Sequence, residues 1–234
     1  MASIITIVRA QTFIDLESGL ILTGYNEVRI PGSGGTRFSL SKDFNTNPDF
    51  FYRIRAGYSW NERHTVLGLF APLTLYYNGI ADRPIDFAGL TYAQGSEIEA
   101  SYRFNSYRLT YRYDFLRKPK FEFGLGFTAK IRDAEIALSG GEQTSSKVNV
   151  GFVPIINLRA NWLFHKKWSL LVDGDALGAS QGRAVDMLLA TTYYATERIM
   201  LRLGYRILEG GADNRSVYNF SLFHYLSFGI TLRL

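Results

Sequence analysis

The 234-residue sequence has no cysteine, so no disulfide can support its fold. This absence suits a protein that passes through an oxidising compartment without cross-links, but many cytosolic proteins lack cysteine as well. No stretch approaches the roughly 18 to 20 consecutive apolar residues of a membrane-spanning helix. The basic residues, which give a formal net charge of +5, are interleaved singly with apolar ones, and this spacing argues against a nucleic-acid partner.

Aromatic residues and strict alternation dominate what the chain does contain. It has 15 Tyr, 17 Phe and 3 Trp, and 47% of its residues are hydrophobic. Residues 218–234 alternate up to the final position, with one face reading Tyr218, Phe220, Leu222, His224, Leu226, Phe228, Ile230, Leu232 and Leu234. A period of two over such a run indicates a strand far longer than the roughly five or six residues usual in soluble sheets. Long strands with one apolar and one polar face are typical of transmembrane β-barrels.

Two kinds of connection alternate along the chain between such segments. The short, charged ones are 61–64, 117–120, 165–167 and 195–198, and the Gly-containing ones are 31–35, 78–96, 140–145, 178–182 and 210–215. Bacterial barrels place short turns on the periplasmic side and longer loops outside, so four turns and five loops predict ten strands. The predicted fold class is therefore all-β, an antiparallel transmembrane β-barrel of about ten strands over residues 12–234, with eight or twelve strands as alternatives.

The alternation also predicts which side chains face lipid. The outward set comprises Tyr52, Ile54, Ala56, Tyr58, Trp60, Leu67, Leu69, Ala71, Leu73, Leu75, Tyr107, Leu109, Tyr111, Tyr113, Phe115, Phe121, Phe123, Leu125, Phe127, Ile131, Val148, Val150, Phe152, Ile156, Leu158, Trp162, Ile199, Leu201, Leu203, Tyr205 and Ile207. No charge falls on it, as lipid requires, because Arg or Lys at the midplane costs about 2–4 kcal/mol. Near 105–106 and 133–134 the alternation slips, which indicates bulges or strand extensions beyond the membrane.

Aromatic residues also gather within a few positions of the short turns. They include Trp60, Trp162, Trp168, Tyr113 and Tyr193. Amphipathic rings prefer the level where a membrane meets water. These residues are therefore predicted to form a membrane-interface girdle.

The last residues carry a second signal. Ser227, Gly229, Leu232 and Leu234 follow the order polar, x, Gly, two spacers and two apolar residues one apart. This pattern resembles the C-terminal assembly signal of bacterial outer-membrane β-barrel proteins, although Leu234 stands where that family most often has Phe. The resemblance implies a place in the outer membrane of a Gram-negative bacterium. It also implies outer-membrane lipid, lipopolysaccharide and the barrel-assembly machinery as partners.

The first residues have a different character from the barrel segments. Residues 1–11 contain a short apolar core, Ile4 to Val8, followed by Ala10 and Gln11. This order resembles the tail of a secretory signal peptide, although the core is short and lacks a basic start. Residues 1–11 are therefore predicted to be a signal-peptide remnant, with the beginning of the first strand as the alternative.

The inward face is predicted to be charged. Its cations are Arg29, Arg53, Arg55, Arg108, Arg112, Lys130, Arg132, Arg159, Arg202, Arg206 and Arg233, and its acids are Asp15, Glu17, Glu27, Asp114, Glu122, Asp173, Asp175 and Asp186. Ten strands lined with long Arg side chains should be mostly filled, because even eight strands leave an interior that side chains fill. Asp173, Asp175, Asp186 and Arg206 fall at similar heights and are expected to pair. The alternative is a narrow, anion-favouring pore lined by the surplus guanidinium groups.

Enzymatic functions find little support in the sequence. Of the three His residues, His64 and His165 fall in short turns and His224 on the lipid-facing side. Proteases of the omptin family, which also have ten strands, would require a His at the outer rim, and lipid A-modifying barrels need a His with a Ser partner. We therefore predict a structural or partner-binding barrel that acts through its external loops, chiefly 78–96, with no cofactor and no metal. A narrow pore and a lipid A-modifying enzyme are the alternatives.

Overall fold

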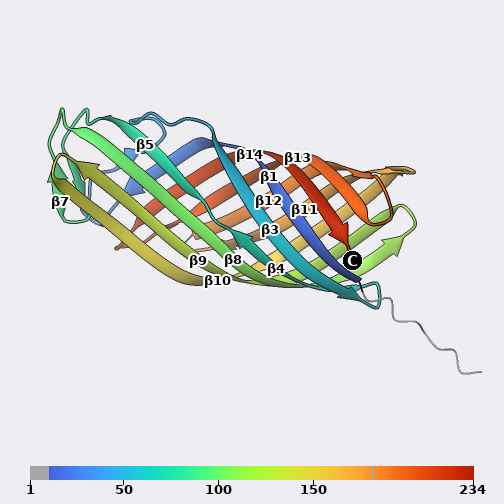
Figure 1. Cartoon of the computed structure of the whole chain (residues 1–234). Coiled ribbons are helices and arrows are strands. Elements are labelled where there is room, and N and C mark those ends of the chain that lie inside the picture. Colours follow the sequence, from blue (N-terminus) through green and yellow to red (C-terminus); the bar gives the residue numbers. More distant parts are fainter. Residues whose placement is uncertain (1–10, 181) are drawn as a thin grey trace, which may run out of the picture.

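The computed structural model describes residues 11–180 and 182–234, and these form a closed antiparallel barrel (Figure 1). The strands are β1 (Gln11–Arg29), β2 (Phe38–Ser39), β3 (Asp49–Trp60), β4 (His64–Ala71), β5 (Thr74–Ile80), β6 (Ile85–Phe87), β7 (Leu90–Tyr92), β8 (Glu97–Lys118), β9 (Phe121–Gly140), β10 (Gln143–His165), β11 (Trp168–Ala179), β12 (Gly182–Tyr194), β13 (Ile199–Asp213) and β14 (Tyr218–Arg233). No helix in the described ranges is long and apolar enough to cross a membrane. The predicted signal-peptide remnant lies outside the described residues, except for Gln11, which opens β1.

The predicted ten-strand barrel is confirmed. Around the wall the strands pair in the order β1, β3, β4, β8, β9, β10, β11, β12, β13 and β14, and β14 closes the barrel on β1 with Leu16 opposite Ile230. Strands β4 and β5 occupy one wall position, because both pair with β8 and are separated by Pro72 and Leu73. Proline cannot donate to a β-ladder, so an interruption there is expected. With β4 and β5 counted as one wall strand, and β2, β6 and β7 outside the wall, ten strands remain.

The connections differ from the prediction on the outer side. The predicted first loop, 31–35, is part of a connection from 30 to 48 that includes β2, which pairs with the end of β1. The predicted loop 140–145 is instead a tight turn between β9 and β10, and most of the predicted loop 178–182 belongs to β11 and β12, which pair as far as Ala179 and Gly182. Apolar residues such as Phe38 and Leu40 explain the first difference, since the longer segment folds onto the barrel and buries them.

A bulge in β1 overturns the predicted inward position of two residues. The register between β1 and β14 shifts between Thr23 and Tyr25. Asp15 and Glu17 face inward below this shift, but Glu27 and Arg29 lie on the outer side above it, where Arg29 packs over the ring of Tyr218. One extra residue in a strand reverses the side that every later residue faces.

The wall strand formed by β4 and β5 has the opposite facing from the one predicted. Leu67 lies on the inward side with Leu69, Ala71, Leu73 and Leu75, the last four being 3–7% exposed, whereas Phe70 and Tyr76 point outward with 41% and 69% exposed. Both faces of this segment are apolar, so alternation of polarity could not distinguish them. Leu73 and Leu75 on the inner face belong to the apolar core that also contains Phe38 and Phe44 of the 30–48 connection.

The residues predicted to face lipid on the other strands lie on the outer side of the barrel. Leu109 and Leu203 are each 60% exposed, and Phe152 is 66% exposed. The slips near 105–106 and 133–134 are strand extensions rather than bulges, because the β8–β9 register runs unbroken through both. A continuous apolar exterior of this kind is what contact with lipid requires.

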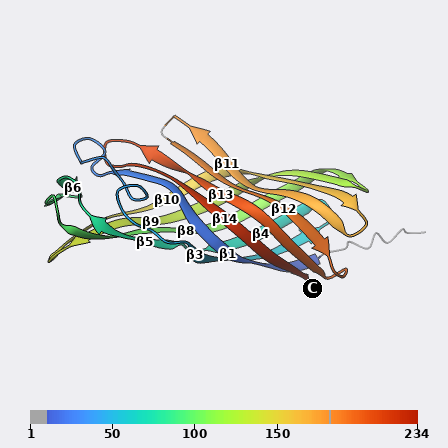
Figure 2. The same ribbon diagram turned by 90° about the horizontal axis from the view of Figure 1, so that it is seen from above.

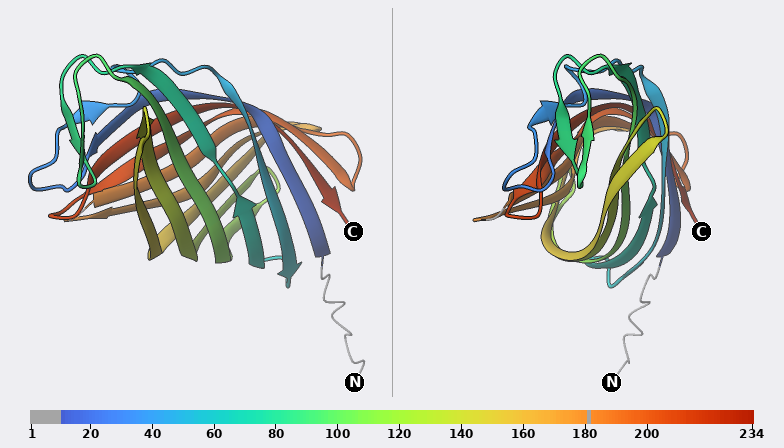
Figure 3. Two further views of the ribbon diagram at one scale, coloured as in Figure 1. Left: turned by 60° about the vertical axis from the view of Figure 1, so that its left-hand side comes forward. Right: turned by 90° about the vertical axis from the view of Figure 1, so that its left-hand side faces the viewer.

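The outer half of the barrel contains an apolar core. Inward side chains of the strands, such as Leu138 and Phe223, pack there with loop residues Phe38, Ile85 and Phe87. The segment 30–48 and the β6–β7 hairpin lie over the end of the barrel opposite the C-terminus (Figure 3). We call these two segments, 30–48 and 81–96, the cap. The cap places an apolar plug above the charged part of the lumen.

Candidate functional site

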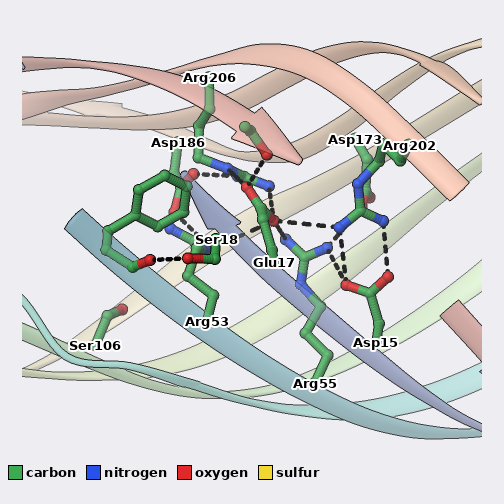
Figure 4. Close-up of polar contacts among 12 residues, drawn as sticks. Asp15, Glu17, Ser18, Arg53, Arg55, Ser106, Asp173, Asp186, Arg202 and Arg206 are labelled. Carbon is green, nitrogen blue, oxygen red and sulfur yellow. Dashed lines mark hydrogen bonds and ion pairs between the residues drawn. The ribbon is translucent and has the colours of Figure 1, made fainter. Parts of the chain in front are cut away.

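A network of ion pairs fills the lumen below the apolar plug (Figure 4). Its residues come from strands on opposite sides of the barrel: Asp15 and Glu17 on β1, Arg53 and Arg55 on β3, Arg108 on β8, Asp173 and Asp175 on β11, Asp186 on β12, and Arg202 and Arg206 on β13. All ten are 0–9% exposed. Five carboxylates therefore meet five guanidinium groups in a space shielded from bulk solvent.

Glu17 and Arg206 form the most buried pair of the network. Arg206 Nε donates to Glu17 Oε1 at 2.7 Å, and Nη2 donates to Oε2 at 2.9 Å. The Ser227 hydroxyl adds a third donor to Oε1 at 2.8 Å. Bidentate, charge-assisted contacts of this kind are the strongest hydrogen bonds that proteins use.

Asp15 has a similar arrangement one step nearer the periplasmic end. Arg202 Nη1 and Nη2 donate to its two carboxylate oxygens at 2.7 and 3.0 Å, and Thr231 donates at 2.6 Å. Arg55 lies 3.5 Å from the same carboxylate and 3.4 Å from Asp173. Arg55 therefore connects β1 with β11 across the lumen.

Asp186 is the centre of the opposite side. Arg206 donates to its Oδ1, while Arg53 and Arg108 donate to its Oδ2 at 2.9 and 2.5 Å. Asp175 stands directly opposite Asp186 on the neighbouring strand. Two adjacent carboxylates would repel each other, and Arg108 offsets this by bonding to both.

The four residues expected to pair do so only in part. Arg206 reaches Asp186, but Asp175 binds Arg108 instead, and Asp173 faces Arg55 and Arg159 at 3.4 and 3.7 Å. Counting residues from the short turns predicts the height of each group in the barrel. It does not predict which strands face each other across the lumen.

Two further predicted lumen cations, Arg112 and Arg159, lie at the margins of the network, whereas Lys130 is buried within it, opposite Arg108. Arg112 pairs with Asp114 of its own strand at 3.2 Å. Arg159 has a quarter of its side chain exposed beside Asp173. The five guanidinium groups at the centre are matched by five carboxylates, so the surplus guanidinium groups that the pore alternative requires are not there. Among the described residues, the one surplus cation at this level is Lys130, which lies 4.8 Å from the centre of the Phe104 ring.

The carboxylates of the network already have Arg partners, and this limits their ability to react or to bind a ligand. Each of the five carboxylates already accepts hydrogen bonds from an Arg or contacts one within 4 Å. A cavity beside Arg53, Arg108 and Tyr225 has a volume of about 10 Å³, room for about one water molecule. Among the described residues, no group of three or more His, Cys, Asp or Glu is arranged to hold a metal ion.

Two of the four residues of the predicted assembly signal, Ser227 and Gly229, also have contacts inside the barrel. Ser227 is fully buried against Glu17, and Gly229 lies under the guanidinium of Arg202. Leu232 pairs with Ile14 and Ile199, whereas Leu234 is 73% exposed at the end of the chain. Recognition by the assembly machinery stays a prediction.

The predicted interface aromatics lie on the outer wall beside the short turns. Trp162 and Trp168 are 51% and 42% exposed, and Trp168 packs on Tyr193 with ring centroids 4.7 Å apart. Trp60 stacks on the His64 ring with centroids 5.1 Å apart, and Tyr113 makes an edge contact with that ring, also at 5.1 Å. Their position suits a girdle, and that role stays a prediction.

Sequence reasoning missed the apolar plug. Ile85, Phe87 and Tyr92 of the 81–96 segment are 1–2% exposed, and Tyr92 Oη donates to the Leu138 carbonyl at 2.9 Å. The segment reads Ile-Asp-Phe and then Leu-Thr-Tyr, a short alternation around Ala88 and Gly89. That alternation was the available signal for a small hairpin, since two such runs around a Gly indicate a turn.

Barrel closure, ten strands and an apolar exterior define the class of this protein as an outer-membrane β-barrel. Its fold is similar to that of the outer membrane protease OmpT from Escherichia coli, with a TM-score of 0.61 and 10% identity over 96% of this chain and 97% of that one. The likeness shows the fold, a closed antiparallel barrel with an apolar outer wall.

Weaker likenesses extend to other outer-membrane proteins. An outer membrane channel from Pseudomonas putida F1 matches with a TM-score of 0.44 and 11% identity over 96% of each chain. Ail, the attachment invasion locus protein of Yersinia pestis, matches with a TM-score of 0.43 and 10% identity over 95% of this chain and 99% of that one. No protein-family model and no curated protein matches the sequence.

Proposed function

We propose that this protein is a non-conducting outer-membrane barrel that binds a partner or ligand through its external cap. The observation that carries the proposal is the double filling of the lumen, with an apolar plug above a network of five buried carboxylates and five buried guanidinium groups. A pore needs a continuous solvated path, and both layers displace water from the axis.

The cap has the rigidity that a binding surface needs. Its two segments are joined by backbone hydrogen bonds from Thr36 to Asp86 at 2.9 Å and from Ala88 to Ile30 at 3.0 Å. Arg83 adds an ion pair with Asp43 at 3.1 Å. A preordered loop surface loses little conformational entropy when a partner binds.

The structure gives the enzyme alternative no added support. The fold resembles that of a protease, but fold alone does not carry function. His64 contacts Tyr111 beside a short turn, and His224 contacts Tyr205 on the outer wall. Neither His has a carboxylate or Ser among its side-chain hydrogen-bond partners in the described part of the chain.

Planar-bilayer recording tests the proposal directly. We expect no steady conductance from the wild type, and also none from a variant in which a Gly-Ser linker replaces residues 82–95, because the ion-pair network still closes the lumen. The same variant should lose binding in a screen of surface ligands that the wild type retains. A steady anion-selective current from the wild type would favour the pore alternative.

A further inference from the structure

The outer half of β10 is a free strand edge. Residues 156–165 pair with β11, whereas residues 143–155 pair with β9 alone in the part of the chain that the structure describes. The β9–β10 and β11–β12 hairpins end far apart (Figure 2). A free edge presents unpaired N–H and C=O groups that can template another strand.

Pro154 shows which backbone groups face the opening. It lacks an N–H, yet it stands opposite Ala129 in an unbroken register with β9. Since successive residues of an antiparallel strand alternate between its two sides, the Pro154 nitrogen points to the open side. Phe152, Val150 and Val148 share its parity and direct their N–H groups to the same side.

This edge lies above the membrane surface and carries exposed apolar side chains. Val148 and Val150 are 50% and 65% exposed on the outer face. Directly opposite them on β9 are Glu135 and Asp133, which pair with Arg103 at 3.0 and 3.3 Å. Charges on the outer face are incompatible with hydrocarbon, so the two valines meet water rather than lipid. An added strand would cover them.

The inward side of the same edge is basic. Lys147 is partly exposed, and Arg132 stands opposite Gly151 and contacts the side chain of Asn149. Neither cation takes part in an ion pair within the described ranges, and the buried Nε of Arg132 has no hydrogen-bond partner there. Carboxylates on an adjoining strand would complement both cations.

We propose that the outer half of β10 docks an extended segment of a partner polypeptide. The segment adds as an antiparallel strand, with acidic residues on the inward side and apolar residues beside Val148 and Val150. A second copy of this chain suits the edge less well, because two barrels upright in one membrane present their β10 strands in the same direction. Lys147 and Pro154 bracket the exposed stretch and limit self-association. The proposal deepens the proposed binding role and uses the strand edge of β10, which adjoins the cap where Ser145 bonds to Tyr92 and to the Phe87 carbonyl.

A charged, alternating peptide is a suitable probe. We would mix the full chain in lipid nanodiscs with a fluorescein-labelled peptide of about eight residues that alternates Glu and Val, and measure anisotropy. The control peptide alternates Lys and Val, and empty nanodiscs report lipid adsorption. We expect saturable binding of the Glu-Val peptide, at least tenfold tighter than the Lys-Val peptide, with slowed amide exchange at Val148, Val150 and Phe152.

Two variants identify the edge as the site. Val150→Pro removes a donor from the open side at the parity where Pro154 is already accommodated, so heat-dependent gel mobility should stay unchanged while binding falls at least tenfold. Lys147→Glu should reverse the preference between the two peptides. If Val150→Pro does not fold, this second variant still tests whether the β10 edge is the binding site. The proposal is overturned if the wild type does not bind the Glu-Val peptide, or if Lys147→Glu binds it as tightly as the wild type does. It is also overturned if sedimentation shows that self-association causes the slowed amide exchange at β10. None of these outcomes bears on conductance or on the cap-replacement variant.

Discussion

Arg206 of β13 and Glu17 of β1 join across the intervening strand β14 through two parallel hydrogen bonds of 2.7 and 2.9 Å. Ser227 of β14 donates to the same carboxylate from between them. Because β14 and β1 form the closing seam, this contact ties the last two strands of the chain to the first. Arg206 also binds Asp186, so one guanidinium connects three wall strands.

Removing that guanidinium should destabilise the barrel. In Arg206→Ala, Glu17 and Asp186 stay buried and lose a charge partner, which typically costs about 3–5 kcal/mol of unfolding free energy. The urea-unfolding midpoint in lipid vesicles measures the loss. The matched control is Arg183→Ala, which removes a pair with Glu209 in which Arg183 is 53% exposed and should cost less than about 1 kcal/mol. An unchanged midpoint for Arg206→Ala would mean that the lumen is solvated at this level.

A charge on the outer wall should prevent stable insertion. Leu203 is 60% exposed in the middle of β13, and Leu203→Arg places a guanidinium in lipid at a cost of about 2–4 kcal/mol. Gln143→Arg adds the same charge beside the β9–β10 turn and should fold like the wild type. Folding yield into vesicles, read by heat-dependent gel mobility, compares the two. Equal yields would contradict the assigned facing.

The seam register can be tested by cross-linking. Ile14 and Leu232 stand directly opposite each other on β1 and β14, and directly opposed strand residues have Cα atoms within disulfide range. Because the chain has no cysteine, Ile14→Cys with Leu232→Cys should give one oxidised product of altered mobility. The pair Ile14→Cys with Phe228→Cys is out of register and should not cross-link. Reaction of only the second pair would show a shifted register.

Substitution of Gly229 can distinguish a role in the assembly signal from a role in packing inside the lumen. A Cβ at this position would lie 2.5 Å from Nη2 of Arg202, which is held by Asp15. Gly229→Ala should therefore lower stability by about 1–3 kcal/mol even in purified protein refolded without assembly machinery. Leu234→Ala, at an exposed terminal position, should affect assembly in cells and leave refolding unchanged. A refolding midpoint for Gly229→Ala equal to the wild type would leave recognition as the reason for glycine.

The sequence alone determined the class of this protein and most of its lipid-facing side, and it predicted about ten strands with eight or twelve as alternatives. Lipid imposes a period of two on every wall strand, and this constraint is local, so it can be read from segments such as 199–207 without their neighbours. The C-terminal strand was evident for the same reason.

The tertiary structure decided what depends on register and on contacts across the lumen. The partner of Arg206 follows from strand tilt and closure, which no single strand encodes. The bulge near Gly24 turned Glu27 and Arg29 to the outer side of the barrel. Both faces of β4 and β5 are apolar, so the alternation of polarity could not show which face points inward. The plug and the free edge of β10 arise from unequal strand lengths and from loops that fold back, because burial there is set by segments far apart in the chain.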